Sequence, residues 1–371
     1  MMLPVDNKTD NASTVTSLLS DFACQPSLHL HKIDPVRRTA LLIVMDEADY
    51  QRESFLDDRV LERARVGAWL PTATLIDTVS APCRAPHFIF HQGHTGSTLL
   101  SRLLDAIGAF GLREPTVLTE IAALHDQLGQ PDALCSREGL EHFLRFMLHV
   151  WARTFHQESA PVVKATSHAG RVGAEILQAA PHARAVALSM RPEPYLAVLL
   201  AGANSLVDLR CFAQERMRRL TRLFGNISSP LFELSVGEMA AMTWLVERAA
   251  QARYLGNAAL AHRAMDVDFD DFLADPEQHL AAIAAHFSLP VERAAIVAAV
   301  RGPVMAQYSK APGQAYSPQH RGAVIAKSRV QNAEEIRRGL AWLDLISARS
   351  AEAAHVVAFS ARGGALPAMS A

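Results

Sequence analysis

Short apolar runs alternate with longer helical patterns over most of this chain. Such runs lie at 40–45, 87–91, 161–166, 185–190 and 264–269. Short apolar runs bounded by Gly, Pro or charged residues are typical of strands that are buried on both faces of a sheet. Between them, apolar residues recur at intervals of three and four, as on one face of a helix. The alternation predicts an α/β fold: a parallel sheet flanked by helices on both faces.

The helical patterns between and after these runs cover most of the remaining chain. We expect helices over 57–65, from 119, over 136–155 and 169–179, from 192, and over 206–224, 236–255, 276–286 and 333–347. Residues up to about 24 are rich in Ser, Thr, Asn and Asp and are expected to be mobile, and the Pro-bounded stretch 81–86 predicts a linker. This divides the chain into a mobile N-terminus and accessory region (1–85), a main P-loop-type domain (86–300), and a C-terminal loop, helix and flexible tail (301–371).

The stretch 87–104 combines a strand, a glycine-bearing turn and an apolar helix. This arrangement directs several backbone N–H groups and a helix N-terminus at one anion. Gly93 and Gly96 allow the backbone to approach a ligand closely, and Ser97 and Thr98 could cap the helix or donate hydroxyls to the anion. A phosphate-type loop is one interpretation; a glycine turn that only begins a core helix is the other.

The loop differs from that of the nucleoside triphosphatases, which has Gly-Lys-Ser/Thr at its end. Ser97 follows Gly96 here, and the turn contains no lysine. The Thr95-Gly96-Ser97-Thr98 core followed by aliphatic residues resembles the 5′-phosphosulfate-binding loop of the sulfotransferases. Those enzymes use the donor 3′-phosphoadenosine 5′-phosphosulfate. The resemblance implies donor binding by residues 93–98, and His94 stands where the family commonly has Lys or Arg.

Three further segments follow in the order that this family shows. Lys164 ends a predicted core strand and resembles the family's lysine near the transferred group, with His168 shortly after it; a lysine that reaches solvent and a histidine at a helix start are the alternatives. Arg191 ends the next strand, as does the arginine that begins the family's 3′-phosphate segment. Leu199 occupies the position of that segment's serine, and Arg191 could instead neutralise Glu193 or Asp268.

The segment from Asp268 to Leu289-Pro290 is the most detailed match to the family, and the role it implies is structural. Asp275-Pro276 there predicts a capped helix start. Arg321 and Gly322 resemble residues that contact the 3′-phosphate in cytosolic sulfotransferases. Glu114 occupies the place of an acidic residue that faces the acceptor, and an ion pair with Arg113 or Lys164 is the alternative for it.

Composition excludes several classes. The chain has 371 residues, half of them hydrophobic, and a formal net charge of −2, so we expect no nucleic-acid partner. The four cysteines are scattered, the N-terminus has no secretory pattern, and no apolar run is long enough for a bilayer. These features predict a cytoplasmic protein. A metal site at His87, His91 and His94 is disfavoured, and the basic run at 216–222 predicts a solvated face or an acidic partner.

Together these observations indicate a sulfotransferase-like enzyme that moves a sulfuryl group from 3′-phosphoadenosine 5′-phosphosulfate to a hydroxyl or amine, without a metal. Lys164 and His94 would stabilise the leaving group, and Glu114 or His168 would act as base. The acceptor is a small molecule, carbohydrate or peptide, and a homodimer stays open. The alternatives are a nucleotide-binding regulatory or scaffold protein with a degenerate donor site, and a P-loop kinase acting on a small molecule.

Overall fold

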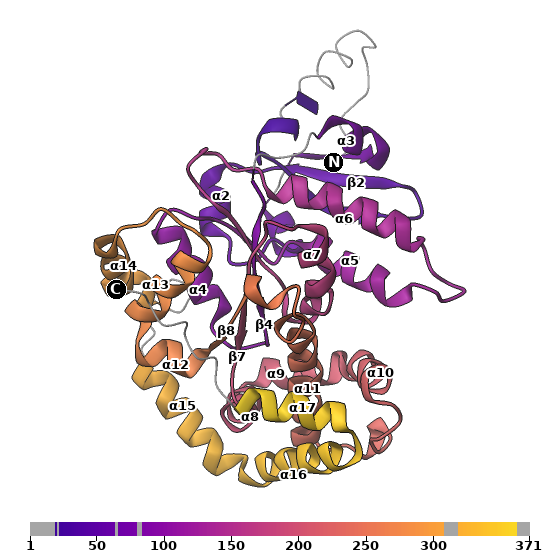
Figure 1. Cartoon of the computed structure of the whole chain (residues 1–371), viewed down its shortest axis with the longest axis vertical. Helices are drawn as coiled ribbons and strands as arrows, with labels where there is room; N and C mark the ends of the chain where they lie inside the picture. The colour runs from indigo at the N-terminus through magenta and orange to yellow at the C-terminus, as the bar shows by residue number, and fades with distance from the viewer. Residues whose placement is uncertain (1–18, 21, 64–65, 80–83, 308–317, 362–371) are drawn as a thin grey trace.

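The computed structural model describes all residues except 1–18, 21, 64–65, 80–83, 308–317 and 362–371 (Figure 1). Its centre is a five-stranded parallel sheet in the order β5-β6-β4-β7-β8. The strands are β4 (His87–His91), β5 (Phe110–Arg113), β6 (Pro161–Lys164), β7 (Ala185–Ser189) and β8 (Ala264–Asp268). The predicted α/β fold is confirmed. Because the strands are parallel, they all end at one edge, which we call the carboxyl edge of the sheet.

Alternate residues of the central strand face two separate hydrophobic clusters. Ile89 belongs to the cluster that contains α4, α8 and α11, whereas Phe88 and Phe90 belong to the cluster on the opposite face. Side chains of a strand alternate between the two faces of a sheet, so an apolar residue at every position requires cover on both. This explains why the strands have no polar alternation in the sequence.

Helices connect the strands and cover both faces, and the longest, α11, spans the lower half of Figure 1. The α-helices of the main sheet region are α4 (Ser97–Ala106), α5 (Thr116–Gln127), α6 (Arg137–Trp151), α7 (Gly173–Ala179), α8 (Pro192–Ala201), α9 (Ala203–Cys211), α10 (Ala213–Phe224), α11 (Val236–Leu255), α12 (Phe269–Ala274), α13 (Pro276–His286) and α14 (Arg293–Arg301). Short 3₁₀ turns are η2 (Ser167–Val172), η3 (Leu231–Glu233), η4 (Ala261–Arg263) and η5 (Pro303–Ala306).

The expected cap at Asp275-Pro276 is present. The Asp275 side chain accepts a hydrogen bond from the Gln278 amide at 3.1 Å, and Pro276 is the first residue of α13. Proline is favoured at this position because its φ suits a helix and its missing N–H would have no partner there.

A second sheet lies before the first one in the chain, at the top of Figure 1. It is antiparallel and consists of β1 (Leu28–Asp34), β2 (Thr39–Val44) and β3 (Gly67–Pro71), with α2 (Glu47–Arg52), η1 (Asp58–Glu62) and α3 (Thr72–Thr78). Its buried residues belong to the same cluster as Phe88 and Phe90. The Ile33 amide also donates to Glu120 on α5 at 3.0 Å. This region therefore packs continuously with one face of the main sheet.

The chain after 302 differs from the expected loop. Besides the predicted helix, which is α16 (Ala333–Arg349), there are α15 (Pro318–Gln331) and α17 (Ala351–Ala361). α15 lies on α8, where the Ser328 hydroxyl donates to the Ala197 carbonyl at 2.6 Å. The predicted mobile N-terminus and half of the predicted linker lie largely outside the described residues. The predicted flexible tail after residue 347 is described as far as 361, where most of it forms α17, so that expectation is wrong there.

The basic run on α10 is a solvated face only in part: Arg218 and Arg222 are exposed, as expected, whereas Arg216 and Arg219 are buried. Arg219 is 5% exposed and pairs with Glu247 of α11 at 2.8 Å, and Arg216, also buried, pairs with Asp208 at 2.7 Å. Buried guanidinium groups require carboxylate partners, and the alternative of an acidic partner within the chain holds. Among the described residues, no helix is both long and apolar enough to span a bilayer.

Candidate anion-binding site at the carboxyl edge

The segment Gln92–Thr98, which we call the phosphate loop, connects β4 to α4. The side chain of Gln92, its first residue, holds it to neighbouring elements. The fully buried Gln92 side chain accepts from the Met190 amide at 3.0 Å and donates to the Trp244 carbonyl at 3.3 Å. The Thr95 hydroxyl donates back to the Gln92 carbonyl at 2.7 Å. Because the base of the loop is attached to β7 and α11, its backbone has a defined direction before any ligand arrives.

Two residues of the loop have left-handed backbone conformations. His94 has φ 65° and Gly96 has φ 71°. Gly96 is the residue that precedes α4, and no side chain of the described residues caps that helix. The expected capping by Ser97 or Thr98 is therefore absent, since both lie inside the helix. The first N–H groups of a helix need partners, and an anion can supply them.

The Thr98 hydroxyl lies in the first turn of α4 and is buried. Thr98 is 2% exposed, and its Oγ1 has no hydrogen-bond partner among the described residues. A buried hydroxyl without a partner loses its hydrogen bonds to water and costs about 1–3 kcal/mol. Such a group beside an uncapped helix N-terminus indicates that a polar ligand belongs there.

The two glycines of the loop have different roles. A methyl group built on Gly96 would overlap the ring of Phe269, so this glycine is required by packing as well as by its φ. A methyl group on Gly93 would meet only the Ser167 Oγ at 3.7 Å and the Tyr195 hydroxyl at 3.9 Å. Gly93, and not Gly96, therefore leaves open space beside the loop.

Lys164 and Glu114 form an ion pair at the ends of β6 and β5. Lys164 is fully buried, and the Glu114 side chain is 13% exposed. The Lys164 ammonium also lies 5.4 Å from the ring centre of Phe55, which comes from the N-terminal region. Since a buried charge requires an opposite charge, the alternative for Glu114 of pairing with Lys164 is the one observed. The other alternative, Arg113, forms its ion pair with Asp105.

Glu114 also has an unusual backbone. Its φ is 54° although it is not glycine, and it precedes Pro115, which disfavours helical conformations at this position. Its amide donates to the Lys164 carbonyl at 2.7 Å. A left-handed non-glycine residue costs about 1–3 kcal/mol, and such strain is typical of functional sites.

His91, at the end of β4, is buried behind this pair. Its Nδ1 lies 2.7 Å from the Gln92 carbonyl and its Nε2 lies 2.7 Å from the Ala165 carbonyl. Burial and the nearby Lys164 charge lower the pKa of His91 to about 4, so the imidazole is neutral at pH 7. Among the described residues, no group of three or more His, Cys, Asp or Glu could hold a metal ion.

The other two candidate histidines contact different residues. His94 is exposed on the loop, and its Nε2 lies 3.3 Å from the Ser205 Oγ at the start of α9. His168 stacks on Phe212, with ring centres 5.4 Å apart. Burial and then Arg171 lower the pKa of His168 to about 4. The remaining charges that act on it are those of Glu247, Arg219 and Arg216, and not those of the Lys164–Glu114 pair.

The candidate 3′-phosphate residues meet at the other half of the edge. Arg191 donates to Asp271 at 2.7 Å and lies 3.7 Å from Asp268, one of the two alternatives considered for it. Arg321 pairs with Asp270 at 2.7 Å. Its guanidinium lies 5.1 Å from the ring centre of Phe269, the ring that fills the space beside Gly96. Gly322 is exposed next to it, and Leu199 is buried in the apolar core.

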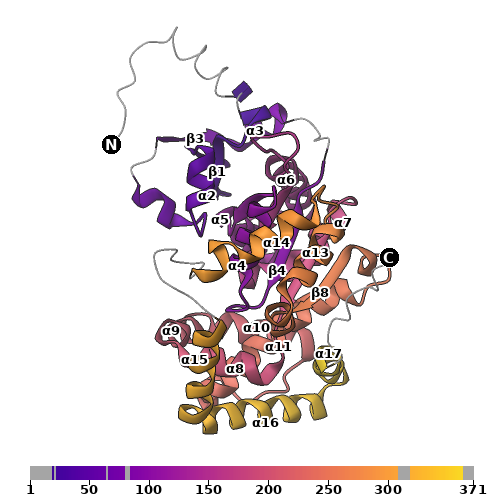
Figure 2. The ribbon, with the colours of Figure 1, turned by 90° about the vertical axis from the view of Figure 1, so that its left-hand side faces the viewer.

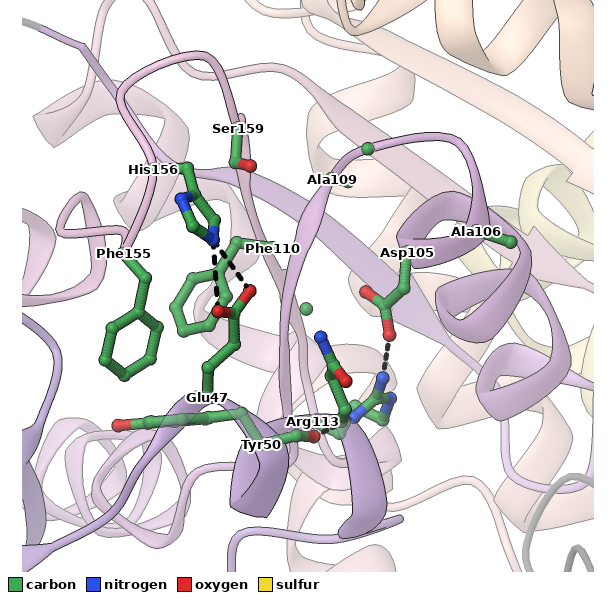
Figure 3. A pocket seen from close by; sticks show the side chains of 13 residues that line it. Glu47, Tyr50, Asp105, Ala106, Ala109, Phe110, Arg113, Phe155, His156 and Ser159 are labelled. Atoms are coloured by element: carbon green, nitrogen blue, oxygen red, sulfur yellow. Dashed lines mark hydrogen bonds and ion pairs between the residues drawn. The ribbon is translucent and has the colours of Figure 1, made fainter. Parts of the chain in front are cut away.

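A cavity of about 330 Å³ lies elsewhere, next to the last turn of α4. Figure 3 shows Glu47 near His156 on one wall and Asp105 near Arg113 on the other, with Phe110 and Phe155 beside the Glu47–His156 pair. The ionic groups on its walls already pair with each other, Glu47 with His156 at 3.0 Å and Asp105 with Arg113. Because the phosphate loop joins the opposite end of α4, this cavity does not belong to the candidate site.

Comparison with known proteins adds little at the level of sequence. No protein-family model matches the chain, and no curated protein matches it. Among solved structures, the sulfotransferase domain from the curacin biosynthetic pathway is 15% identical over 76% of this chain and all of that chain, with a TM-score of 0.40. The sulfotransferase domain of the Synechococcus PCC 7002 olefin synthase is 17% identical over 71% of this chain and 97% of that chain, with a TM-score of 0.35.

A third similar structure is the sulfotransferase STF9 from Mycobacterium avium. It is 12% identical over 89% of this chain and 98% of that chain, with a TM-score of 0.34. These likenesses to sulfotransferases lie at low identities and TM-scores, so they decide nothing about the chemistry of this chain. What the chain itself shows is an α/β protein with an uncapped, hydroxyl-lined loop at the carboxyl edge of its sheet.

The structure thus brings the predicted residues to one edge in two groups: the loop with Lys164 and Glu114, and the arginines with the carboxylates of 268–271. Three residues near the first group were not predicted as site residues from the sequence. Phe55 lies in a segment with no motif, Tyr195 lies in a helix that was considered only for Arg191 before it and Leu199 within it, and His91 was considered only as a metal ligand.

Proposed function

We propose that this protein transfers a sulfuryl group from 3′-phosphoadenosine 5′-phosphosulfate to a hydroxyl or amine acceptor. The observation that carries the proposal is the uncapped N-terminus of α4 with the buried, partnerless Thr98 hydroxyl beside it. An anion with several acceptor oxygens would satisfy both. The choice of a phosphosulfate over a nucleoside triphosphate is supported by the sequence, where the loop lacks a lysine.

In this proposal the backbone of Gly93, His94, Thr95, Gly96, Ser97 and Thr98 holds the 5′-phosphosulfate. The acceptor oxygen or nitrogen attacks sulfur while the bond from sulfur to the 5′-phosphate oxygen breaks, and the 3′,5′-bisphosphate leaves. Charge grows on that leaving oxygen, and Lys164 and His94 are the cations proposed to balance it. His94 does so only when protonated, which distinguishes it from a lysine.

Glu114 is the proposed base. Its carboxylate pairs with Lys164 in the absence of a ligand, so a donor anion and Glu114 would share one ammonium group. When Lys164 turns toward the donor, the carboxylate can accept the proton of the acceptor hydroxyl or amine. His168, which is neutral at pH 7 but stacked on Phe212, is the second candidate for this role.

Arg191, Arg321 and the backbone at Gly322 are proposed to bind the 3′-phosphate. A guanidinium binds a phosphate through paired hydrogen bonds. Both arginines pair with Asp270 or Asp271 without a ligand, so the phosphate would have to replace these carboxylates.

The test is titration calorimetry of the full chain with 3′-phosphoadenosine 5′-phosphosulfate and, separately, with ATP and Mg²⁺. We expect the sulfate donor to bind and ATP to bind at least tenfold more weakly. Tighter binding of ATP with Mg²⁺ would overturn the proposal in favour of the kinase alternative. Transfer of ³⁵S from the donor to a panel of hydroxyl and amine acceptors completes the test, because donor binding with no transfer would favour the regulatory or scaffold alternative.

A further inference from the structure

Tyr195 presents a buried hydroxyl to the phosphate loop. It lies near the start of α8, is 1% exposed, and its hydroxyl has no hydrogen-bond partner among the described residues. This oxygen lies 3.9 Å from the place where a methyl group on Gly93 would be, on the same side as the Ser167 Oγ. The hydroxyl therefore points into the space that Gly93 leaves open beside the loop.

The phenol of Tyr195 can act only as a neutral donor and acceptor at physiological pH. Burial raises the pKa of Tyr195 far above its ordinary value, and the nearby Arg216 cation opposes this effect without reversing it. The carboxylates of Glu247 and Asp208 act in the same direction as burial. A buried O–H donor without an acceptor is unfavourable, and at Tyr195 an acceptor oxygen in the open space beside Gly93 would satisfy it.

We propose that Tyr195 is a binding residue for the anion on the phosphate loop, its hydroxyl donating to a ligand oxygen that lies against Gly93. The identity of that anion as a phosphosulfate rests on the proposed function. The contact reaches the ligand from α8, opposite the α4 N-terminus, so the loop and Tyr195 would hold the anion from two sides. Leu199, on the same helix, stands at the position of the family's serine and has no hydroxyl. Tyr195 supplies a hydroxyl from that helix.

The chain offers a matched control in Tyr254. This tyrosine is also fully buried, and its hydroxyl also has no partner among the described residues. It lies on the opposite face of the sheet, where its ring packs next to Phe90 and Gly173. Removing either hydroxyl thus removes the same chemical group from the same degree of burial, but only Tyr195 lies beside the loop.

The experiment compares Tyr195→Phe and Tyr254→Phe with wild type by titration calorimetry, and records the melting temperature of each variant without ligand. The probes are 3′-phosphoadenosine 5′-phosphosulfate, ATP with Mg²⁺, and sodium sulfate. We expect Tyr195→Phe to weaken donor binding about tenfold, and Tyr254→Phe to leave it within about twofold, as the loss of one hydrogen bond predicts. Neither variant should melt below wild type, because neither loses a hydrogen bond within the protein.

The outcomes separate this inference from the proposed function. If the donor binds equally to wild type and Tyr195→Phe, the inference is overturned while the proposed function stands. If wild type binds only ATP or sulfate, and Tyr195→Phe weakens that binding, the proposed function fails and the Tyr195 contact stands. An equal loss in both tyrosine variants would show that the effect comes from packing, which overturns the inference.

Discussion

The two halves of the carboxyl edge carry their cations in different ways. Beside β5 and β6, Lys164 is completely buried and pairs with Glu114, a strained residue that is itself mostly buried. Beside β7 and β8, Arg191 is 53% exposed and pairs with Asp271 at the surface. Burial of the Lys164–Glu114 pair has a desolvation cost, which lowers the stability of the fold. An exposed ion pair has little such cost and stabilises the fold by about 0–1 kcal/mol.

Under the proposed function, this difference assigns the reaction to the half that holds Lys164 and Glu114. A buried cation keeps its full charge effect because water does not screen it, and it lies beside the uncapped loop. The half-exposed Arg191 can change partners at little cost, which suits the recognition of a phosphate group distant from the reaction. The following changes test this division, in order of the effect expected.

Substituting Lys164 should have the largest effect. Lys164→Ala removes the buried cation that pairs with the Glu114 carboxylate, so the free energy of unfolding should fall by about 3–5 kcal/mol and transfer should be lost. The double variant Lys164→Met/Glu114→Gln removes both charges and should recover most of that stability without recovering transfer. Urea denaturation measures the stability, and ³⁵S transfer measures the activity. Full stability in Lys164→Ala would show that the pair is not energetically coupled.

Gly96→Ala should be the next most damaging change. The added methyl group overlaps Phe269, and alanine disfavours the left-handed φ of 71°, so we expect a loss of about 2–3 kcal/mol in urea denaturation. The reason is packing, and not obstruction of the anion. A Gly96→Ala protein as stable as wild type would contradict the observed contact of the loop with Phe269.

His91 should make the buried half sensitive to acid. Its pKa is about 4 in the folded protein against an ordinary value near 6.5, so the unfolded chain binds a proton that the folded protein does not. The free energy of unfolding should therefore fall as the pH drops from 6.5 to 4, by about 1.4 kcal/mol per pH unit from this histidine. His91→Gln should show a shallower slope between these values. Parallel slopes in the two proteins would mean that His91 titrates normally.

Arg191→Ala and Arg321→Ala should have the smallest effect on the fold. Because Arg191 is half exposed, its loss should change the free energy of unfolding by less than about 1 kcal/mol. Each variant should reduce the preference for the 3′-phosphorylated donor over adenosine 5′-phosphosulfate about tenfold, as the loss of a charged phosphate contact predicts. Calorimetry with the two donors measures the preference. A wild type that does not distinguish them would exclude a 3′-phosphate subsite at these arginines.

The parts of the molecule that depend on local sequence were the ones that could be predicted. The central strands of the main sheet are apolar except at their ends, and the loop after β4 carries its glycines and hydroxyls within a few residues. Asp275-Pro276 likewise determines the start of α13 locally. The sequence offered Lys164 and Arg113 as alternative partners for Glu114. The pairing of β5 with β6 brings Glu114 next to Lys164 and so decides between them.

The parts that depend on tertiary packing could not be predicted. β1 places His29 and His31 in the interior, where a strand pattern predicts polar residues outside, and β3 is largely exposed. α15 is a polar helix that is attached through few buried residues, among them Ile325 and Ser328. Phe55 reaches Lys164 from a segment without periodicity, and nothing local marks the Tyr195 hydroxyl as facing Gly93.

The most direct test of the central claim is calorimetric titration of Gly93→Ala and wild type with 3′-phosphoadenosine 5′-phosphosulfate. The added methyl group makes only ordinary contacts at 3.7 and 3.9 Å, so the variant should melt within about 2 °C of wild type, since surface-like changes of a few tenths of a kcal/mol shift melting by no more. It fills the space in which the anion is proposed to lie, so donor affinity should fall at least a hundredfold. A folded Gly93→Ala protein that binds the donor as wild type does would contradict the assignment of this loop as the donor site.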